Sequence, residues 1–224
     1  MNIIIFFLQM GIIIGALYGA YRLGKEALIT LCSIMSVLAN FFVLQQIEFF
    51  GWNATSSDAF AIGTLFGLNL LQQTYGRETA KKALWISFFA MVFFVAVSQV
   101  HLLYIPGDAD TSRNHFQALL SSTPRLLLAS LGTFLLVQWL DLRMYGFALK
   151  RWSAISWRLR STGCLIISQA IDTALFSALG LWGVLSDLGS IMAVSYGIKC
   201  AAILITTIGA YFFNPRLSLS GHEI

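Results

Sequence analysis

The sequence predicts an all-α integral membrane protein, and three observations support this fold class. Of the 224 residues, 58% are hydrophobic and only 11% are charged, and the mean hydropathy is +0.77. A soluble domain usually carries about 25% charged residues, so these charges are too few to cover a globular surface. Leu, Ile, Val and Phe recur in long runs, without the alternating ten-residue pattern of a membrane β-barrel. Much of the apolar surface is therefore expected to face lipid.

Seven apolar segments approach the length of a membrane-spanning helix, which needs about 20 residues to cross about 30 Å of hydrocarbon. The third segment is the shortest. All three prolines lie at segment edges, where a helix tolerates them. The sequence thus predicts about seven transmembrane helices in one domain, residues 1–224. In chain order the segments are Asn2–Tyr21, Ala27–Ile47, Ala59–Tyr75, Ala83–Ile105, Arg125–Phe147, Ser161–Leu185 and Ser190–Phe213.

The loops between these segments alternate in charge. Eleven of the fourteen Lys and Arg residues fall on one side of the predicted membrane, within residues 22–26, 76–82 and 143–160 and in the C-terminal tail. Basic loops stay in the cytoplasm, so the N-terminus is predicted outside and the C-terminus inside. This topology requires an odd number of spans, which agrees with seven. The net charge of +4 is then a topology signal, and no nucleic-acid partner is expected.

The first segment is predicted to be a permanent helix. It has no basic residues before it and no clear cleavage site of a signal peptide. Gly11, Gly15 and Gly19 form a repeated GxxxG pattern, which lets another helix approach closely. Glycine is also common in membrane helices, so the pattern indicates either a packing face or ordinary composition.

Two ionisable residues lie near the middle of apolar segments, where each costs about 2.5–3.5 kcal/mol. At about 1.5 Å per residue, Asp172 lies roughly 16 Å from the inner end of its helix and Lys199 roughly 14 Å from the outer end of the next. The two side chains are therefore expected to meet near the midplane. They form either a structural ion pair or part of a polar pocket.

Neutral polar residues favour the pocket. The stretches Ser130–Asp141 and Ser161–Asp172 match at Ser, Gly, Gln and Asp, and both end in Gln-x-x-Asp. Asn40 and Asn69 interrupt two further apolar helices. Amide and carboxylate groups can read the edge of a planar heterocycle, although a Na⁺ or H⁺ path uses similar groups.

Other chemistries have weaker support in the sequence. The three cysteines and three histidines show no metal-ligand spacing, and the cysteines are expected to be buried free thiols. No Gly-x-x-x-x-Gly-Lys-Ser/Thr motif is present, so any ATP must be used by another chain. An intramembrane aspartyl enzyme using Asp141 and Asp172 is a remote alternative, because the Gly-x-Gly-Asp context is missing. No enzyme activity, cofactor or metal is expected.

Five stretches, in order along the chain, resemble motifs of the queuosine-precursor transporter family, also called the vitamin-uptake-transporter family. "GLNLLQQTYGRETAKKALW" resembles the family signature with Tyr-Gly followed by two basic residues, and "SQAIDTALF" resembles its Ser-Gln-x-x-Asp-Thr motif. The five stretches are Gly24–Val43, Gly67–Trp85, Pro124–Asp141, Ser168–Phe176 and Tyr196–Thr207.

The resemblance implies a six-helix core, residues 24–213, similar to the vitamin-binding subunits of energy-coupling-factor importers. One extra helix (residues 1–23) precedes this core, and a cytoplasmic tail (214–224) follows it. The resemblance also implies import of a 7-deazaguanine precursor of queuosine (preQ0, preQ1 or queuine) through a bacterial inner membrane, for tRNA modification. The pocket residues it implies are Asn40, Asn69, Arg125, Gln138, Asp141, Gln169, Asp172 and Lys199.

One position departs from the family pattern. Many members have Glu where this chain has Gln73, two residues before the Tyr of Tyr-Gly. A cationic aminomethyl group would favour a carboxylate there, so the expected ligand is a neutral base or one whose charge is met elsewhere. Import of another heterocycle or vitamin is the alternative, and energising partner subunits and self-association stay open.

Overall fold

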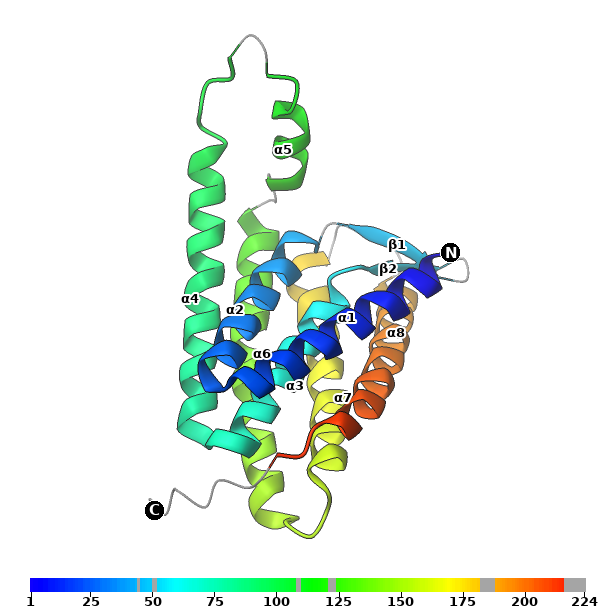
Figure 1. The fold of residues 1–224 in the computed structure, drawn as a ribbon. Helices are drawn as coiled ribbons and strands as arrows, with labels where there is room; N and C mark the ends of the chain where they lie inside the picture. The colour runs from blue at the N-terminus through cyan, green and yellow to red at the C-terminus, as the bar shows by residue number, and fades with distance from the viewer. Residues whose placement is uncertain (44, 50–51, 108–109, 121–123, 182–187, 216–224) are drawn as a thin grey trace.

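The computed structural model describes residues 1–43, 45–49, 52–107, 110–120, 124–181 and 188–215, and these are mostly helical (Figure 1). This confirms the predicted all-α class. Two short helices, η1 (Ser177–Leu181, π-type) and η2 (Ala210–Phe212, 3-10), continue α7 and α8. The α-helices are α1 (Asn2–Leu23), α2 (Lys25–Phe41), α3 (Asp58–Tyr75), α4 (Arg77–His101), α5 (Arg113–Leu120), α6 (Pro124–Arg151), α7 (Trp157–Phe176) and α8 (Leu188–Gly209).

Five helices in the described part of the chain are long and apolar enough to cross a membrane. The seven predicted segments all contain a helix, but α2 has only 17 residues and α3, with 18, is more polar. The finding supports a multi-pass membrane protein and falls short of seven spans. The five candidate spans are Asn2–Leu23, Arg77–His101, Leu127–Arg151, Trp157–Gly180 and Met192–Phe212.

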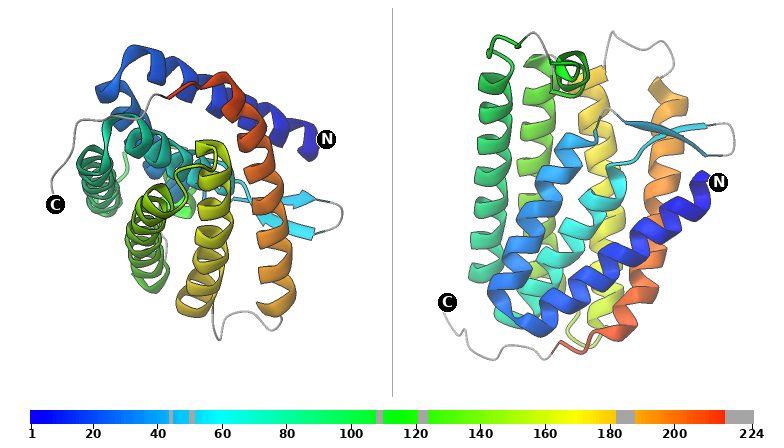
Figure 2. Two further views of the ribbon diagram at one scale, coloured as in Figure 1. Left: turned by 90° about the horizontal axis from the view of Figure 1, so that it is seen from below. Right: turned by 45° about the horizontal axis from the view of Figure 1, so that its top comes forward.

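The helix α3 lies at the centre of the bundle and contacts α1, α2, α4, α6, α7 and α8 (Figures 1 and 2). Fourteen of its 18 residues are buried. Its glycines allow this close packing, because a Cβ at Gly63 would lie 2.7 Å from Ile13 and one at Gly67 would lie 2.6 Å from Cys32. Neighbouring helices shield α3 from lipid, so its sequence need not be strongly apolar.

The helix α1 crosses the bundle diagonally (Figure 2, right). It packs on the core through buried residues that include Met10, Ile13 and Leu17. A Cβ added at any glycine of the GxxxG pattern would meet no atom within 4 Å. The predicted close approach through these glycines is therefore not used within the described chain, and larger side chains on another face of α1 make the contact.

The predicted second segment was too long. It ends at Phe41, and a two-stranded antiparallel hairpin follows, formed by β1 (Gln46–Phe49) and β2 (Trp52–Thr55) with Gln46 opposite Thr55. Aromatic and β-branched residues favour strands, and here a short apolar run was mistaken for the end of a helix. The short helix α5 was also not predicted.

The basic connections gather at one end of the bundle, as the alternating loops predict. The α1–α2, α3–α4 and α6–α7 turns lie at this end, and the hairpin and α5 lie at the other (Figure 1). Gly24 and Gly76 make two of these tight turns with φ of 111° and 86°, values that favour glycine. Arg158 closes the same end by donating to the carbonyl of Ala210 at 3.1 Å.

Candidate functional site

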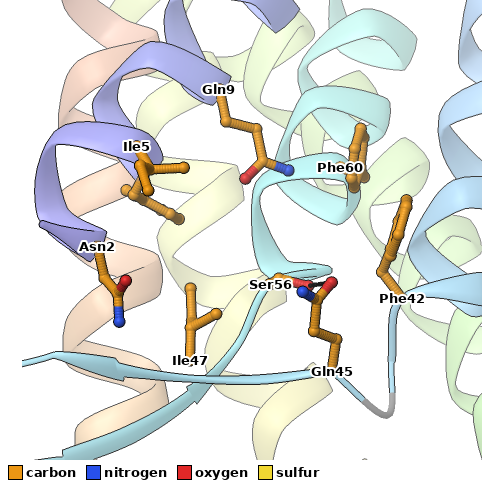
Figure 3. A pocket seen from close by; sticks show the side chains of 9 residues that line it. Asn2, Ile5, Gln9, Phe42, Gln45, Ile47, Ser56 and Phe60 are labelled. Atoms are coloured by element: carbon orange, nitrogen blue, oxygen red, sulfur yellow. Dashed lines mark hydrogen bonds between the residues drawn. The ribbon is translucent and has the colours of Figure 1, made fainter.

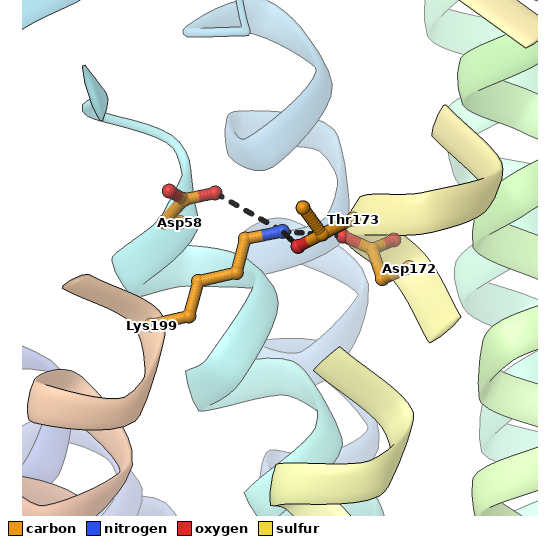
Figure 4. A network of polar contacts seen from close by, with 4 residues as sticks. All are labelled: Asp58, Asp172, Thr173 and Lys199. Atoms are coloured by element: carbon orange, nitrogen blue, oxygen red, sulfur yellow. Dashed lines mark hydrogen bonds and ion pairs between the residues drawn. The ribbon is translucent and has the colours of Figure 1, made fainter. Parts of the chain in front are cut away.

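Three helices bring together a buried group of charges, which we call the ion cluster: Asp58, Asp172, Thr173 and Lys199 (Figure 4). The Lys199 ammonium lies 2.6 Å from Asp172 Oδ2, 3.2 Å from Thr173 Oγ1 and 3.6 Å from Asp58 Oδ1. The exposed fractions of the Lys199, Asp58 and Asp172 side chains are 5%, 9% and 23%. The predicted meeting of Asp172 and Lys199 is confirmed.

Asp58 is the member of this cluster that sequence reasoning missed. It is the first residue of α3, and its position at the edge of an apolar segment made it look like a loop charge. The available signal was an acidic residue in the first helical turn, where the positive end of the helix dipole favours a negative charge. Its second oxygen, Oδ2, has no hydrogen-bond partner among the described residues.

A second polar group surrounds the contact between α6 and α7, where Ser168 Oγ donates to Asp141 Oδ1 at 2.6 Å. Asn69 of α3 joins it, donating to Ser161 at 3.2 Å and interacting with Asp141. Gln138 is one turn before Asp141, and Gln169 follows Ser168 directly. We call Asn69, Gln138, Asp141, Ser168 and Gln169 the amide cluster; each is 3% exposed or less.

Several oxygens of the amide cluster are left without a donor among the described residues. Four of its buried oxygens lack a hydrogen-bond partner in the described structure: Asn69 Oδ1, Gln138 Oε1, Asp141 Oδ2 and Gln169 Oε1. Leaving a buried polar group unpaired costs about 1–3 kcal/mol. A small polar molecule that presents several N–H donors would supply the partners that these oxygens lack.

The two clusters occupy successive turns of α7. Ser168 and Asp172 are four residues apart, which corresponds to about 6 Å along a helix. Asp141 bonds to Ser168 and Asp172 bonds to Lys199, so different partners hold these two acids. They do not form the directly adjacent carboxylate pair that an aspartyl protease uses.

Gln73 belongs to a different contact network. Its Oε1 accepts from Tyr145 Oη at 2.8 Å and from the Arg160 guanidinium at 3.2 Å. Arg160 also donates to the backbone carbonyls of Trp152 and Ser153 in the α6–α7 turn. The sequence pattern predicted that Arg160 is a charge of the loop before α7. The Arg160 side chain is instead buried, and it connects the α6–α7 turn to α3.

The remaining predicted residues are placed less centrally. Asn40 Nδ2 donates to Ser130 Oγ at 2.9 Å and thereby joins α2 to α6. Arg125 lies in the first turn of α6, and its side chain is outside the described residues. Cys32 and Cys164 are buried free thiols as expected, whereas Cys200 is half-buried.

A cavity of about 350 Å³ lies between α1, the hairpin and the start of α3, near the end of the bundle where the hairpin lies (Figure 3). The rings of Phe42 and Phe60 stack at its wall, 5.8 Å apart. None of the residues predicted for the pocket lines it. Its walls are formed by Asn2, Ile5, Phe6, Gln9, Phe42, Gln45, Ile47, Ser56 and Phe60.

Comparisons with known proteins agree on one family. Residues 59–213 match the model of the family described as "Putative vitamin uptake transporter". The chain is also 32% identical over 193 residues to a Bacillus subtilis protein named "Probable queuosine precursor transporter", covering 84% of this chain and 83% of the relative. No solved structure matches.

Proposed function

The chain belongs to the vitamin uptake transporter family, and from this premise we propose that it imports a 7-deazaguanine precursor of queuosine across a bacterial inner membrane. The ligand would be preQ0, preQ1 or queuine, used for tRNA modification. The observation that carries the proposal is the group of four unpartnered oxygens on α3, α6 and α7. A guanine-like base presents an N–H and an exocyclic amino group on one edge, and these donors match that surface.

The amide cluster is the proposed reading surface for the base. The Asp141 carboxylate accepts from two N–H groups of the guanine-like edge, and Gln138 and Gln169 fix the remaining polar atoms. Hydrogen bonds to a charged group contribute about 1.5–3 kcal/mol each. Asp172, one turn further along α7, and its partner Lys199 of α8 would hold the opposite side of the ligand. Asn40, Gln73 and Arg125 are proposed to support this pocket from its edges.

The proposed architecture is a six-helix core, residues 24–213, resembling the substrate-binding subunits of energy-coupling-factor importers. Helix α1 is the additional span, and residues 214–224 are a cytoplasmic tail. By helix geometry α2 and α3 are about 26–27 Å long, enough to cross most of the hydrocarbon layer together with the five longer helices. The gathering of three basic turns at one end supports an outside N-terminus and a cytoplasmic C-terminus.

Import of a different vitamin-like heterocycle is the second candidate function. The description of the matching family as a vitamin uptake transporter favours it. The tRNA-modification experiment described next separates the two candidate functions, because only a queuosine precursor restores queuosine in tRNA.

The test uses a bacterium that lacks both queuosine synthesis and its own importer. Cells that express this chain receive preQ0, preQ1 or queuine, and queuosine in tRNA is measured. We expect at least one ligand to restore queuosine. Asp141→Asn and Gln169→Ala should abolish this at unchanged membrane abundance. Ile167→Ala is the matched control, because it removes an exposed side chain from the same helix.

Two results would count against the proposal. If no precursor restores queuosine while the protein is verified in the membrane, the ligand is a different molecule or a partner subunit is required. If Gln169→Ala transports as well as Ile167→Ala, the amide cluster does not read the ligand.

A further inference from the structure

The ion cluster contains one more acid than base. Two carboxylates, Asp58 and Asp172, share the single ammonium of Lys199. With all three groups ionised, the cluster would hold a net negative charge inside the membrane. An uncompensated charge there is costly, and one bound proton removes it.

The geometry indicates which carboxylate holds that proton. Asp172 makes the short contact of 2.6 Å with Lys199, whereas Asp58 is 3.6 Å away. Asp58 is also the more buried of the two acids, and its Oδ2 has no partner among the described residues. The weaker ion pair and the deeper burial both favour a neutral Asp58. Asp172 is more accessible and remains available to a ligand.

Within the described part of the chain, few other charges face Asp58. Lys199 from α8 and Asp172 from α7 are the described groups that interact with it electrostatically. The charged residues of α2 and the basic residues of α4 lie at the opposite end of the bundle, and Asp141 of α6 is held by Ser168. Among the nearer elements, Glu48 of β1 is exposed and His101 of α4 packs on Tyr104 and Phe116.

The cavity under the hairpin lies beside the start of α3. It is bounded by Ser56 and Phe60, each two residues from Asp58 in the sequence, and it carries the amides of Gln9 and Gln45 (Figure 3). Asp58 itself does not line the cavity, but polar groups of this kind can hold water close to it. A metal cation fits the cluster poorly, because it would lie beside the Lys199 ammonium and be repelled by it.

We propose that Asp58 carries the proton of a proton-coupled uptake cycle, an inference that rests on the transport function proposed above. On the outer side one proton binds the Asp58 carboxylate, and the cluster becomes neutral with Lys199 held by Asp172. The loaded carrier then reorients without a net charge in the cluster. On the cytoplasmic side the ligand leaves and Asp58 releases the proton. The empty carrier then returns unprotonated, with Lys199 shared by both carboxylates, so one proton enters with each ligand and no covalent bond changes.

The test uses the full chain in proteoliposomes with tritium-labelled preQ0, preQ1 and queuine, each assayed separately. Counterflow exchange without a gradient measures transport alone. Accumulation is then driven by an outside-acid gradient of one pH unit with the membrane potential clamped at zero. For one proton per ligand we expect about tenfold accumulation, since about 1.4 kcal/mol corresponds to a factor of ten.

Asp58→Asn imitates the permanently protonated residue. It should retain counterflow but accumulate ligand only to a ratio of about one, whereas Asp58→Glu should restore gradient-driven accumulation. Asp110→Asn is the matched control, because Asp110 is an exposed carboxylate bonded to Ser112 in the α4–α5 connection. It should behave as wild type in both assays.

The other possible outcomes distinguish failure of the transport proposal from failure of the proton-coupling proposal. Wild-type protein without counterflow of any of the three ligands refutes the import of a queuosine precursor by this chain alone, and the coupling with it. Counterflow without gradient-driven accumulation leaves transport standing and overturns the coupling. Accumulation by Asp58→Asn at the wild-type level assigns the proton to another group. Loss of counterflow in Asp58→Asn, with folded protein, gives Asp58 a structural or ligand-binding role and also overturns the proposal.

Discussion

Removing the Lys199 ammonium is the perturbation whose energetic effect follows most directly from the structure. Lys199→Met keeps most of the side-chain volume but leaves Asp58 and Asp172 without their shared cation. Breaking a buried pair by removing one partner costs about 3–5 kcal/mol. Lys199 holds two acids, at 3.6 Å and 2.6 Å, so we expect a loss of unfolding free energy in that range.

A surface pair provides the control for this measurement. Lys25 lies 3.6 Å from Glu26, a distance equal to that of Lys199 from Asp58, but the two surface side chains are 45% and 82% exposed. Exposed pairs contribute about 0–1 kcal/mol, so Lys25→Met should have little effect. The free energy of unfolding is measured by titrating folded protein in mixed micelles with a denaturing detergent. Equal stability of the two variants would refute the reasoning that burial gives the ion cluster its strength.

The triple variant Asp58→Asn, Asp172→Asn, Lys199→Met extends the test. It removes all the charges together, and replacement of a whole buried ionic group is often close to neutral. Most of the stability lost in Lys199→Met should therefore return, although transport should not. A triple variant as unstable as the single one would show that packing of the lysine stem, and not its charge, stabilises α8.

Three further predictions concern other contacts. Because Arg160 already contacts Gln73, a Gln73→Glu variant should form an ion pair with Arg160, and its melting temperature should rise. The ratio of preQ1 to preQ0 uptake should stay near that of the wild type; a shifted ratio would instead support the specificity role expected from the sequence. Gly67→Val should destabilise the protein by about 1–3 kcal/mol through overpacking, because even a Cβ would lie 2.6 Å from Cys32. Gly163→Ala is the control, because a Cβ at Gly163 would meet no atom within 4 Å. Equal stability of the two variants would refute the close packing at Gly67. Asn40→Ala and Ser130→Ala in a double-mutant cycle should give a coupling of about 0.6–1.7 kcal/mol, as for other hydrogen bonds between membrane helices; zero coupling would show that the contact contributes nothing.

The sequence predicted those parts of the site that stand out against an apolar background. Asp172 and Lys199 were recognisable because a charge far from both ends of an apolar run needs a partner, and helix depth placed the two at the same level. Asp58 and Arg160 were missed for the opposite reason. Each lies next to a loop, and a charge there looks solvated until the fold shows which end of a helix is covered.

The limits of the fold prediction have a similar physical origin. Helices that contact lipid have an apolar composition, so the outer helices could be predicted well from the sequence. Helix α3 is surrounded by protein, and its polar residues made it the weakest of the predicted segments. The hairpin was missed because four-residue strands are too short to show a period that distinguishes them from a helix end.

The antiparallel packing of α6 and α7 places their two similar Gln-x-x-Asp sequences side by side in opposite directions. Their order along the chain is the same, so their order across the membrane is reversed, as the Asp141–Ser168 contact shows. Gln138 and Gln169 then lie between the two acids, with Asp141 towards the basic end and Asp172 towards the hairpin. This arrangement is a small inverted repeat with an approximate two-fold axis in the membrane plane. If these residues bind the ligand as proposed, a molecule arriving from either face would meet a carboxylate first and an amide second, and one binding region would serve both entry and release.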